Sequence, residues 1–421
     1  MTSSKTRPHW LSRRLKFLCS VNMGQSPDST DVTPFQEDGD LPFLQGNAEF
    51  GDVFPTPKHA CGNPPKKAHK GDILLSVRAP VGAMNLADRE CGIGRGLCSI
   101  TSNNIGTAYL WWSLHHYRCD LFRVATGSTY EAVSAEEVRD LNLLVPPFEE
   151  QESIASFLNH ETKRIDELIH EKEQMLELLA EKRAALVTQA VTRGLDSKVR
   201  LKPSGIDWLG EIPAHWELVR LKFLATIRTG LTIGKDYGAK ELSEYYYLRV
   251  ANVQDGYLDL SDVTKVLVSE SEAAGCLLKM GDVLMNEGGD IDKLGRGCVW
   301  KAEIEPCLHQ NHVFAVRPHS VDSEWLAMWT STLPAKSYFE QRAKRTTNLA
   351  SISSTNIKEI SVPLPPPGEQ KAILDFIAEA TAHFDDVKAT TLRSIDLLRE
   401  RRSAVITTAV TGQLALEEMT P

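Results

Sequence analysis

The second half of this 421-residue chain repeats its first half, and this repeat restricts the possible folds more than any other feature of the sequence. The matched positions are Pro146-Pro147 with Pro365-Pro366, Glu150-Gln151 with Glu369-Gln370, Asp166 with Asp385, Arg183 with Arg402, and Ala190-Val191-Thr192 with Ala409-Val410-Thr411. All of them share one numbering difference, so the match has no gap. Chance does not sustain such a match, and the chain is therefore built from two copies of one unit.

Each copy predicts one long helix. Apolar residues recur at heptad spacing at Leu158, Ile165, Leu179 and Leu186 in the first copy and at Ile377, Phe384, Leu398 and Val405 in the second. Lys172 and Thr391 interrupt both series at the same place. Prolines precede each helix, and Gly194 and Gly412 follow it. A helix of about 43 residues is roughly 65 Å long. Two unrelated surface helices are the alternative, but the shared register favours a paired coiled coil.

A weaker repeat precedes each helix. The matched segments are His9-Trp10 with His215-Trp216, Arg14-Leu15-Lys16-Phe17-Leu18 with Arg220-Leu221-Lys222-Phe223-Leu224, Gly24 with Gly230, Gly71-Asp72-Ile73-Leu74 with Gly281-Asp282-Val283-Leu284, and Ser134 with Ser353. Between these segments the two copies diverge. Short β-rich runs alternate with turns and a few helical stretches. The pattern predicts two mixed α/β heads that share a scaffold and carry different surfaces.

Composition indicates a globular protein with hydrophobic content of 42% and charged content of 24%. No segment reaches the ~18 apolar residues of a membrane helix, so we expect a cytoplasmic protein. Cys307, His309 and His312 could suggest a metal cluster, but their spacing fits no zinc pattern. The net charge of −9 is unusual for a nucleic-acid binder, so any basic surface must be local.

The order head, helix, head, helix favours antiparallel helices and a pseudo-two-fold arrangement. Two heads on a stiff spacer suit the reading of two half-sites on one DNA duplex.

One segment makes the chain resemble a known protein family. It runs Pro203-Ser-Gly-Ile-Asp207-Trp208-Leu-Gly-Glu-Ile-Pro-Ala-His215-Trp216. With the two proline-rich Glu-Gln segments and the paired helices, it resembles the specificity (S) subunit of type I restriction-modification systems over essentially the whole chain. The resemblance implies an α+β protein with two target-recognition domains separated by two long antiparallel coiled-coil helices. It implies a first recognition domain at 1–145, a spacer helix at 146–201, a second recognition domain at 202–362 and a second spacer helix at 363–421. We call 1–145 the first head and 202–362 the second head.

The resemblance also implies partners. The heads would bind double-stranded DNA, and the helices would dock two methyltransferase (M) subunits, with two motor-nuclease (R) subunits completing the complex. S-adenosylmethionine would be bound by the methyltransferase subunit, and this chain would bind no cofactor or metal and have no catalytic residues.

In the first head, the predicted phosphate contacts are Lys66, Lys67, His69 and Lys70, and the predicted base contacts are Ser76, Arg78 and Arg95. A solvated loop is the alternative. The segment Asn63-Pro64-Pro65-Lys66 is similar to an adenine-methyltransferase motif but lacks its aromatic residue, so we interpret it as a turn. The glycines of Gly92-Ile-Gly94-Arg95-Gly96 lack the spacing of a nucleotide-binding loop and would let the backbone approach DNA.

In the second head, the predicted contacts are Lys293, Arg296, His309, Gln310, Asn311, His312, Arg342, Lys344 and Arg345, with Thr346, Thr347 and Asn348 alongside. Their amides suit adenine and their cations suit the DNA backbone. Buried turn residues are the alternative for Gln310 and Asn311. Trp111, Trp112, Trp325 and Trp329 fit a core better than a base-stacking surface.

Two other functions compete with a specificity subunit. A self-sufficient methyltransferase or nuclease would need a cofactor loop and an intact catalytic motif, which the sequence lacks. A DNA-binding coiled-coil scaffold or regulator would bind DNA without associated modification enzymes.

Overall fold

The computed structural model describes residues 9–35, 41–124, 132–234, 241–289, 291–345 and 349–419. These residues form two compact units. The first unit comprises Met1–Glu173 and Leu392–Pro421, and the second comprises Gln174–Thr391. Each unit therefore contains one head together with part of each long helix.

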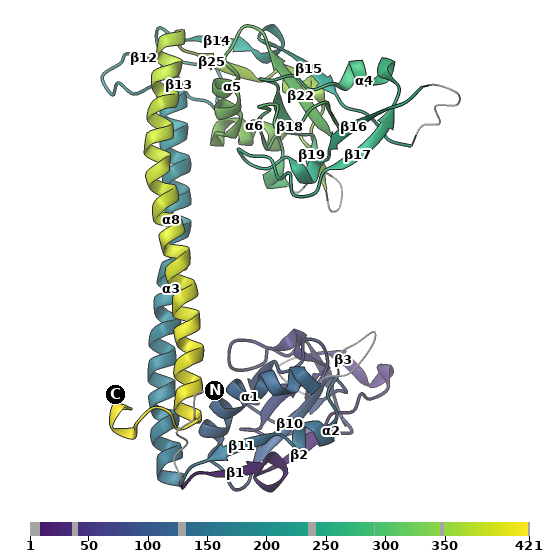
Figure 1. Ribbon diagram of the computed structural model, residues 1–421, viewed down its shortest axis with the longest axis vertical. Coiled ribbons are helices and arrows are strands. Elements are labelled where there is room, and N and C mark those ends of the chain that lie inside the picture. The colour runs from purple at the N-terminus through teal and green to yellow at the C-terminus, as the bar shows by residue number, and fades with distance from the viewer. Residues whose placement is uncertain are drawn as a thin grey trace. The chain divides into compact units, whose positions relative to one another are not determined.

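The two long helices are α3 (Phe148–Arg193), with 46 residues, and α8 (Pro367–Val410), with 44. They confirm one continuous helix per copy of the repeat (Figure 1). The same glutamine fixes the start of each helix: the Gln151 and Gln370 amides donate to carbonyl groups of the preceding prolines at 2.9 and 2.8 Å. Each helix ends at a glycine with positive φ, Gly194 at 74° and Gly412 at 72°.

Within each unit the two helices run antiparallel and share a repeated ion pair. In the first unit, Arg402 Nε donates to Asp166 Oδ1 at 2.8 Å. In the second unit, the matching residues Arg183 and Asp385 are 3.9 Å apart between Nε and Oδ1. These four residues are matched in the sequence repeat, so the same pair forms twice. The aspartate lies on α3 and the arginine on α8 in the first unit, and the reverse holds in the second unit.

The first head contains a two-stranded, a four-stranded and a five-stranded sheet, in the orders β1-β11, β2-β10-β7-β8 and β3-β5-β4-β9-β6. Its strands are β1 (Leu11–Arg14), β2 (Cys19–Met23), β3 (Val32–Pro34), β4 (Pro42–Leu44), β5 (His59–Cys61), β6 (Lys67–Ala68), β7 (Ile73–Ser76), β8 (Met84–Leu86), β9 (Cys91–Ile93), β10 (Leu97–Ser102) and β11 (Asn142–Val145). Its helices are α1 (Thr107–Val124) and α2 (Ala135–Arg139), with short 3-10 turns η1 (Leu15–Phe17), η2 (Ser29–Asp31) and η3 (Asn47–Glu49).

The second head repeats the main sheets as β14-β25, β15-β22-β18-β20 and β17-β16-β21, and adds β19-β24-β23 and the hairpin β12-β13. Its strands are β12 (Leu201–Pro203), β13 (Glu211–Pro213), β14 (Glu217–Arg220), β15 (Ala225–Thr229), β16 (Ser243–Leu248), β17 (Thr264–Val268), β18 (Val283–Asn286), β19 (Gly288–Gly289), β20 (Gly297–Val299), β21 (Cys307–His309), β22 (Val313–Pro318), β23 (Lys344–Arg345), β24 (Ala350–Ser351) and β25 (Ser361–Leu364). Its helices are α4 (Glu270–Cys276), α5 (Ser323–Ser331), α6 (Leu333–Arg342) and α7 (Ser354–Lys358), with 3-10 turns η4 (Leu221–Phe223), η5 (Val250–Asn252) and η6 (Ile291–Lys293).

Each head core includes the end of a long helix. In the first unit, Ile406 and Val410 of α8 belong to the same buried cluster as Trp10. In the second unit, Val187 and Val191 of α3 belong to the cluster around Trp216. The head and the helix end therefore bury apolar surface together, and this burial stabilises both.

The tryptophans confirm the prediction of core positions. Trp325 and Trp329 are fully buried in α5, and Trp112 in α1 is 5% exposed. Trp111 is partly buried and packs against the same core as Trp112. Across the described ranges, no helix combines the length and apolarity needed to cross a membrane, and no group of His, Cys, Asp and Glu could hold a metal ion.

The glycine at the end of α8 gives a first testable prediction. A Cβ at Gly412 would lie 3.2 Å from the Trp10 ring, on a backbone with a φ of +72°. We expect Gly412→Ala to lower the free energy of unfolding of the first unit by about 1–2 kcal/mol, because an L-residue is strained there. Urea unfolding measures this loss. Gly368→Ala is the control, since Gly368 has no atom within 4 Å of its Cβ position and lies in the first turn of α8. Equal losses for both variants would contradict the argument.

Candidate nucleic-acid interface

Both heads place a loop at the end of a parallel strand pair. In the first head β4 runs parallel to β9, with Leu44 opposite Ile93. In the second head β16 runs parallel to β21, with Leu248 opposite His309. We call residues 94–96 and 310–312, which follow β9 and β21, the strand-end loops.

The backbones of the two strand-end loops make the same hydrogen bonds. Gly94 N donates to Leu44 O at 2.8 Å, and Gln310 N donates to Leu248 O at 2.9 Å. Three more bonds of the first head have a counterpart in the second. Leu97 N donates to Gly94 O as Val313 N does to Gln310 O, and Gln25 N donates to Ile93 O as Leu231 N does to His309 O. Val77 N donates to Gly96 O as Glu287 N does to His312 O. Equivalent backbone bonds make Gly94 equivalent to Gln310. The next residues, Arg95 and Asn311, therefore occupy the same position in the two heads.

The repeated glycines Gly24 and Gly230 are needed for this loop. A Cβ at Gly24 would lie 2.1 Å from Gly94 O, and one at Gly230 would lie 2.0 Å from His309 O. Since neither position has room for a side chain, each glycine lets the loop pack tightly against the end of the neighbouring strand.

The glycines around Arg95 have a different role from the one that the sequence predicts. A Cβ at Gly94 would lie 2.9 Å from Gln45 Cα, and one at Gly96 would lie 2.7 Å from Gln45 O. These glycines therefore let the loop approach another part of the protein. This corrects the prediction that they bring the backbone close to DNA, although Arg95 itself is exposed.

A hollow of about 520 Å³ lies beside the strand-end loop of the first head. It is lined by Gln45, Gly46, Asn47, Ala48, Glu49, Lys58, His59, Ser76, Arg78, Ala79, Arg95 and Gly96. The structure thus brings together the three predicted base contacts Ser76, Arg78 and Arg95. Arg78 and Arg95 are exposed, whereas Ser76 is 1% exposed and its hydroxyl donates to Arg78 O at 2.8 Å. The prediction of a base contact by the Ser76 side chain is wrong, because a buried hydroxyl cannot reach a ligand.

Glu49 is a member of this hollow that sequence reasoning missed. Its side chain is 5% exposed, and His59 Nδ1 lies 2.9 Å from its Oε1. Its Oε2 accepts from Gln45 N at 3.2 Å. Glu49 thus holds His59 and the backbone of Gln45 in place, in a hollow that Arg78 and Arg95 also line. No motif surrounds Glu49 in the sequence, so its place in the hollow could be predicted only from the pairing of the strands.

The four predicted phosphate contacts of the first head lie on β6 or directly before and after it, and all four are exposed: Lys66, Lys67, His69 and Lys70. Lys66 O accepts from Ile93 N at 3.0 Å, so this strand borders the strand-end loop. Lys67 Nζ lies 2.9 Å from Glu90 Oε1, and its hydrogen bond lowers the pKa of Glu90. Pro64 is buried and lies against Gly92, which fits our interpretation of the Asn-Pro-Pro segment as a turn.

A hollow of about 640 Å³ in the second head contains Lys293 and Arg296. It is lined by Asp255, Lys293, Arg296, Leu333, Lys336, Ser337 and Glu340. Arg296 Nη2 donates to Val253 O at 3.2 Å, so this side chain is held in the wall of the hollow. The charges are mixed, with Lys336 Nζ 3.4 Å from Asp255 Oδ2.

The predicted run from His309 to His312 divides into buried and exposed side chains. His309 is 1% exposed, its Nδ1 lies 2.6 Å from Val313 O, and burial lowers its pKa. The prediction that His309 contacts DNA is therefore wrong, since this side chain lies inside the core. Gln310 Oε1 accepts from Val250 N at 3.2 Å. Asn311 is half-buried beside His312, and His312 pairs with Glu287 at 2.8 Å.

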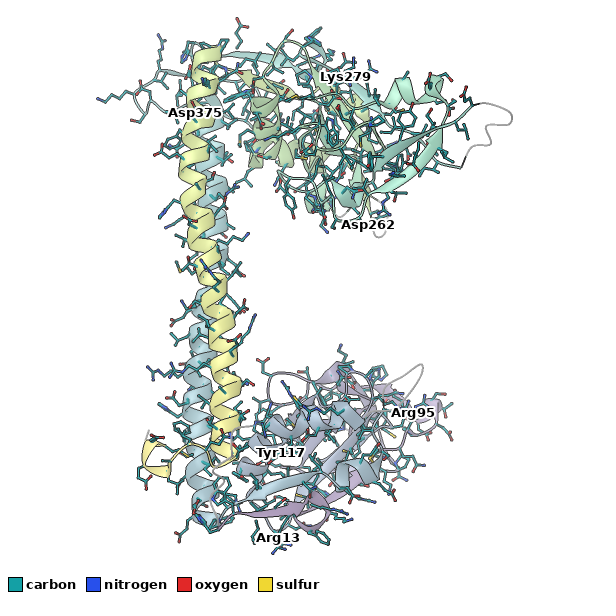
Figure 2. The ribbon with its side chains drawn as sticks, viewed as in Figure 1. Arg13, Arg95, Tyr117, Asp262, Lys279 and Asp375 are labelled. Carbon is teal, nitrogen blue, oxygen red and sulfur yellow. The ribbon has the colours of Figure 1, made fainter. Side chains whose placement is uncertain are left out.

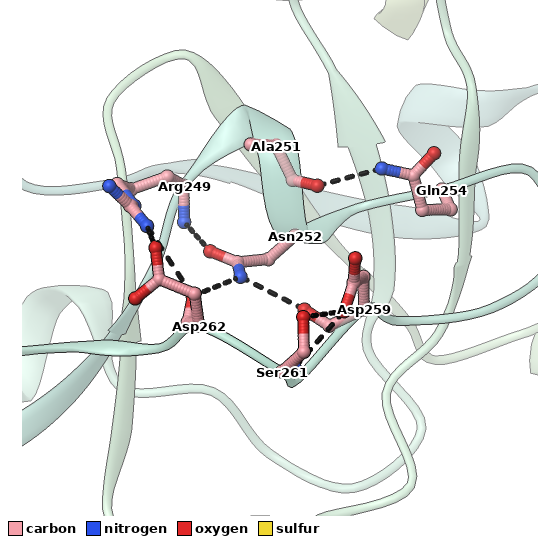
Figure 3. Close-up of polar contacts among 7 residues, drawn as sticks. All are labelled: Arg249, Ala251, Asn252, Gln254, Asp259, Ser261 and Asp262. Carbon is pink, nitrogen blue, oxygen red and sulfur yellow. Dashed lines mark hydrogen bonds and ion pairs between the residues drawn. The ribbon is translucent and has the colours of Figure 1, made fainter. Parts of the chain in front are cut away.

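The turn after β16 is held by its own polar side chains (Figure 3). Asn252 Oδ1 accepts from Arg249 N at 2.8 Å, and Asn252 Nδ2 donates to carbonyl oxygens of Asp259 and Asp262 at 2.9 Å each. Arg249 Nη2 lies 2.8 Å from Asp262 Oδ2. Asn252 ends η5 as Glu49 ends η3, so an amide in one head stands where the other head has a carboxylate.

The remaining predicted contacts lie at the end of α6 and on β23. Arg342, Lys344 and Arg345 are all exposed, and the Arg342 guanidinium lies 4.5 Å from the centre of the Tyr338 ring. Lys344 and Arg345 pair with β24, whose other neighbour is β19. They are not among the residues that line the hollow of Lys293 and Arg296. Thr346, Thr347 and Asn348 lie outside the described residues.

Comparison with known proteins divides the chain into the same two copies as the sequence repeat. The family model described as "Type I restriction modification DNA specificity domain" matches residues 9–178 and 213–396. The chain belongs to this family. Both matches cover a head and most of the helix that follows it, so the family domain occurs here twice.

Relatives within the type I restriction modification DNA specificity family are specificity subunits. The chain is 34% identical over 184 residues to the putative type I restriction enzyme MjaX specificity subunit of Methanocaldococcus jannaschii, covering 43% of this chain and 41% of the relative. It is 23% identical over 307 residues to the type I restriction enzyme EcoKI specificity subunit of Escherichia coli K12, covering 72% and 64%. The chain therefore spans less than two thirds of the length of these two curated relatives.

Solved structures support the fold. One matching chain comes from a study of complex assembly and conformational transition of the type I R-M system, with a TM-score of 0.74, 18% identity, and coverage of 97% of this chain and 100% of that one. The HsdS subunit from Thermoanaerobacter tengcongensis matches with a TM-score of 0.50 and 18% identity, covering 98% and 99%. The two-headed α+β fold with two long helices is thus a known fold.

Proposed function

We propose that this chain is the DNA-specificity subunit of a type I restriction-modification enzyme and reads a split DNA target with its two heads. One observation carries the proposal: both heads hold a strand-end loop by the same backbone bonds and present a different polar side chain at the same position, Arg95 or Asn311. A shared scaffold with exchanged polar residues suits two half-sites of different sequence.

The chemistry of the two side chains differs in a definite way. An arginine suits the O6 and N7 acceptors of guanine, whereas an asparagine suits the N6 donor and N7 acceptor of adenine. We infer that Arg95 contacts a guanine in one half-site and that Asn311 contacts an adenine at the equivalent place in the other. Arg78 would contact a base beside it, and Lys66, Lys67, His69 and Lys70 would hold the DNA backbone.

Membership of the family supports a proposal about the partners. We propose that the chain assembles with two methyltransferase subunits and two motor-nuclease subunits, and that it contributes no catalytic residue. S-adenosylmethionine would bind the methyltransferase subunit, where the adenine chemistry takes place. Since the substrate is genomic DNA, we infer that the complex works in the cytoplasm.

Sequencing of methylated DNA tests the proposal. The chain is expressed together with its neighbouring methyltransferase subunit, and single-molecule sequencing maps N6-methyladenine in the cellular DNA. We expect methylation of one split motif, which disappears when this chain is omitted. A soluble complex of the two proteins that leaves the DNA unmethylated would instead indicate a DNA-binding scaffold without modification activity.

A further inference from the structure

The two heads share a surface feature as well as a scaffold. The segment Arg-Leu-Lys-Phe-Leu occurs in both, and its leucines Leu15, Leu18, Leu221 and Leu224 are buried in the two cores. Core packing explains why the leucines recur. It does not explain the phenylalanines, because Phe17 is 61% exposed and Phe223 is 63% exposed.

Each phenylalanine stands in a cluster of the same charged groups. In the first head, Lys16 Nζ lies 5.7 Å from the centre of the Phe17 ring and 2.7 Å from Asp140 Oδ1, and Arg14 Nη1 lies 3.3 Å from the same oxygen. The hydrogen bond from Lys16 lowers the pKa of Asp140. We call Arg14, Lys16, Phe17 and Asp140 the Phe17 cluster.

The second head repeats this geometry. Lys222 Nζ lies 5.3 Å from the centre of the Phe223 ring and 2.7 Å from Glu359 Oε1, and Arg220 Nη1 lies 3.0 Å from Glu359 Oε2. We call Arg220, Lys222, Phe223 and Glu359 the Phe223 cluster. Asp140 and Glu359 each cap the helix that precedes the last strand of their head. The carboxylate is thus retained although its side-chain length differs.

Stability of the heads does not account for this repetition. Ion pairs between side chains that are about half exposed contribute only ~0–1 kcal/mol, and the carboxylates and arginines of both clusters are 41–57% exposed. An exposed phenylalanine ring buries little apolar surface. Neither core packing nor ion pairing explains the exposed rings, so their repetition points to a contact that both heads make with the same molecule.

The chemistry of the clusters favours a protein as that molecule. Sequence reading by the two heads requires different side chains, and the strand-end loops supply them. In each cluster both cations already share one carboxylate, which weakens their attraction for phosphate. Arg13, next to the Phe17 cluster, lies well apart from Arg95 of the hollow (Figure 2). An exposed ring flanked by two cations and one anion fits an apolar pocket with an acidic rim.

We propose that the Phe17 cluster and the Phe223 cluster each dock one copy of the same partner protein, with the phenylalanine ring as the anchor. This inference rests on the proposed function, which identifies the partner as the methyltransferase subunit, and it adds a contact at each head to the docking on the helices that the resemblance implies. One copy would then be held at each head by the same contact.

The number of bound methyltransferase subunits tests the inference. The full chain and its variants are each mixed with the purified methyltransferase subunit, and native mass spectrometry counts the copies bound. We expect two copies on the unaltered chain, one on Phe17→Ala or Phe223→Ala, and none on the double variant at the same concentration, with affinity lowered at least tenfold. Phe17→Tyr should retain both copies, because its ring still fills the pocket.

Leu267→Ala is the matched control, since Leu267 is 59% exposed in the second head but lies outside the repeated segment. Circular dichroism checks that every variant is folded. Two copies bound to the double variant with unchanged affinity would overturn the inference. So would a double variant that keeps both copies but binds DNA more weakly, because the clusters would then contact the DNA backbone. If the unaltered chain bound no methyltransferase subunit, the proposed function would fail together with the inference.

Discussion

Replacement of Arg317 by methionine is expected to lower the free energy of unfolding of the second unit by about 3–5 kcal/mol, because it leaves a buried carboxylate without its cationic partner. Arg317 Nε donates to Asp282 Oδ1 at 2.7 Å, and its Nη2 donates to Asp282 Oδ2 at 2.6 Å. Asp282 is 1% exposed, and Arg317 is 21% exposed. The hydrogen bonds to Asp282 also raise the pKa of Arg317, so the guanidinium stays charged at neutral pH.

Urea unfolding followed by tryptophan fluorescence measures this effect, since Trp216, Trp325 and Trp329 report on the core of the second head. Lys301→Met provides the control. Lys301 and Glu324 form a pair at 3.3 Å with side chains that are 64% and 54% exposed, and such a pair contributes less than about 1 kcal/mol. A loss below about 1 kcal/mol for Arg317→Met would show that the buried pair does not support the core.

The variant Arg95→Asn is expected to change the sequence that the first head reads. Its backbone position is equivalent to that of Asn311, so the new side chain should favour adenine where Arg95 favours guanine. A bidentate contact discriminates between bases by about 1–3 kcal/mol, which is roughly 5- to 150-fold in affinity. The reciprocal variant Asn311→Arg should change the other half-site from adenine to guanine at one position.

The methylated motif of each variant is the measurement, with the same sequencing of N6-methyladenine. Arg89→Asn is the control, because Arg89 is an exposed arginine of the first head that pairs with Asp88 and does not line the hollow. We expect its motif to be unchanged. An Arg95→Asn variant that methylates the original motif at the full level would exclude Arg95 as a base contact, although the proposed function would stand.

The long helices could be predicted from sequence because their determinants are local. Heptad spacing, proline before the helix and glycine after it all act within one segment, and α3 and α8 follow them. The shared scaffold of the heads could also be predicted in part. Gly24 and Gly230 match in the sequence, and the structure shows that both meet a strand-end loop that leaves no room for a side chain.

The composition of the hollow could not be predicted in full, because strands far apart in sequence create it. Glu49, Arg78 and Arg95 meet only after β4 pairs in parallel with β9. Polar residue type was also a poor guide to exposure: Ser76 and His309 were predicted as DNA contacts, yet each is the last residue of a buried strand. The equivalence of Arg95 and Asn311 likewise depends on backbone bonds that no motif in the sequence indicates.

The way in which α8 completes the first unit has a consequence for biosynthesis. Ile406, Ala409, Val410 and Met419 belong to the core of a head whose other buried core residues are made in the first part of translation. The first unit also includes Leu392–Pro421, so it cannot finish folding while the ribosome is still making the second unit. The head made first is therefore completed last. Until then, the part of its apolar core surface that α8 covers stays exposed in the nascent chain.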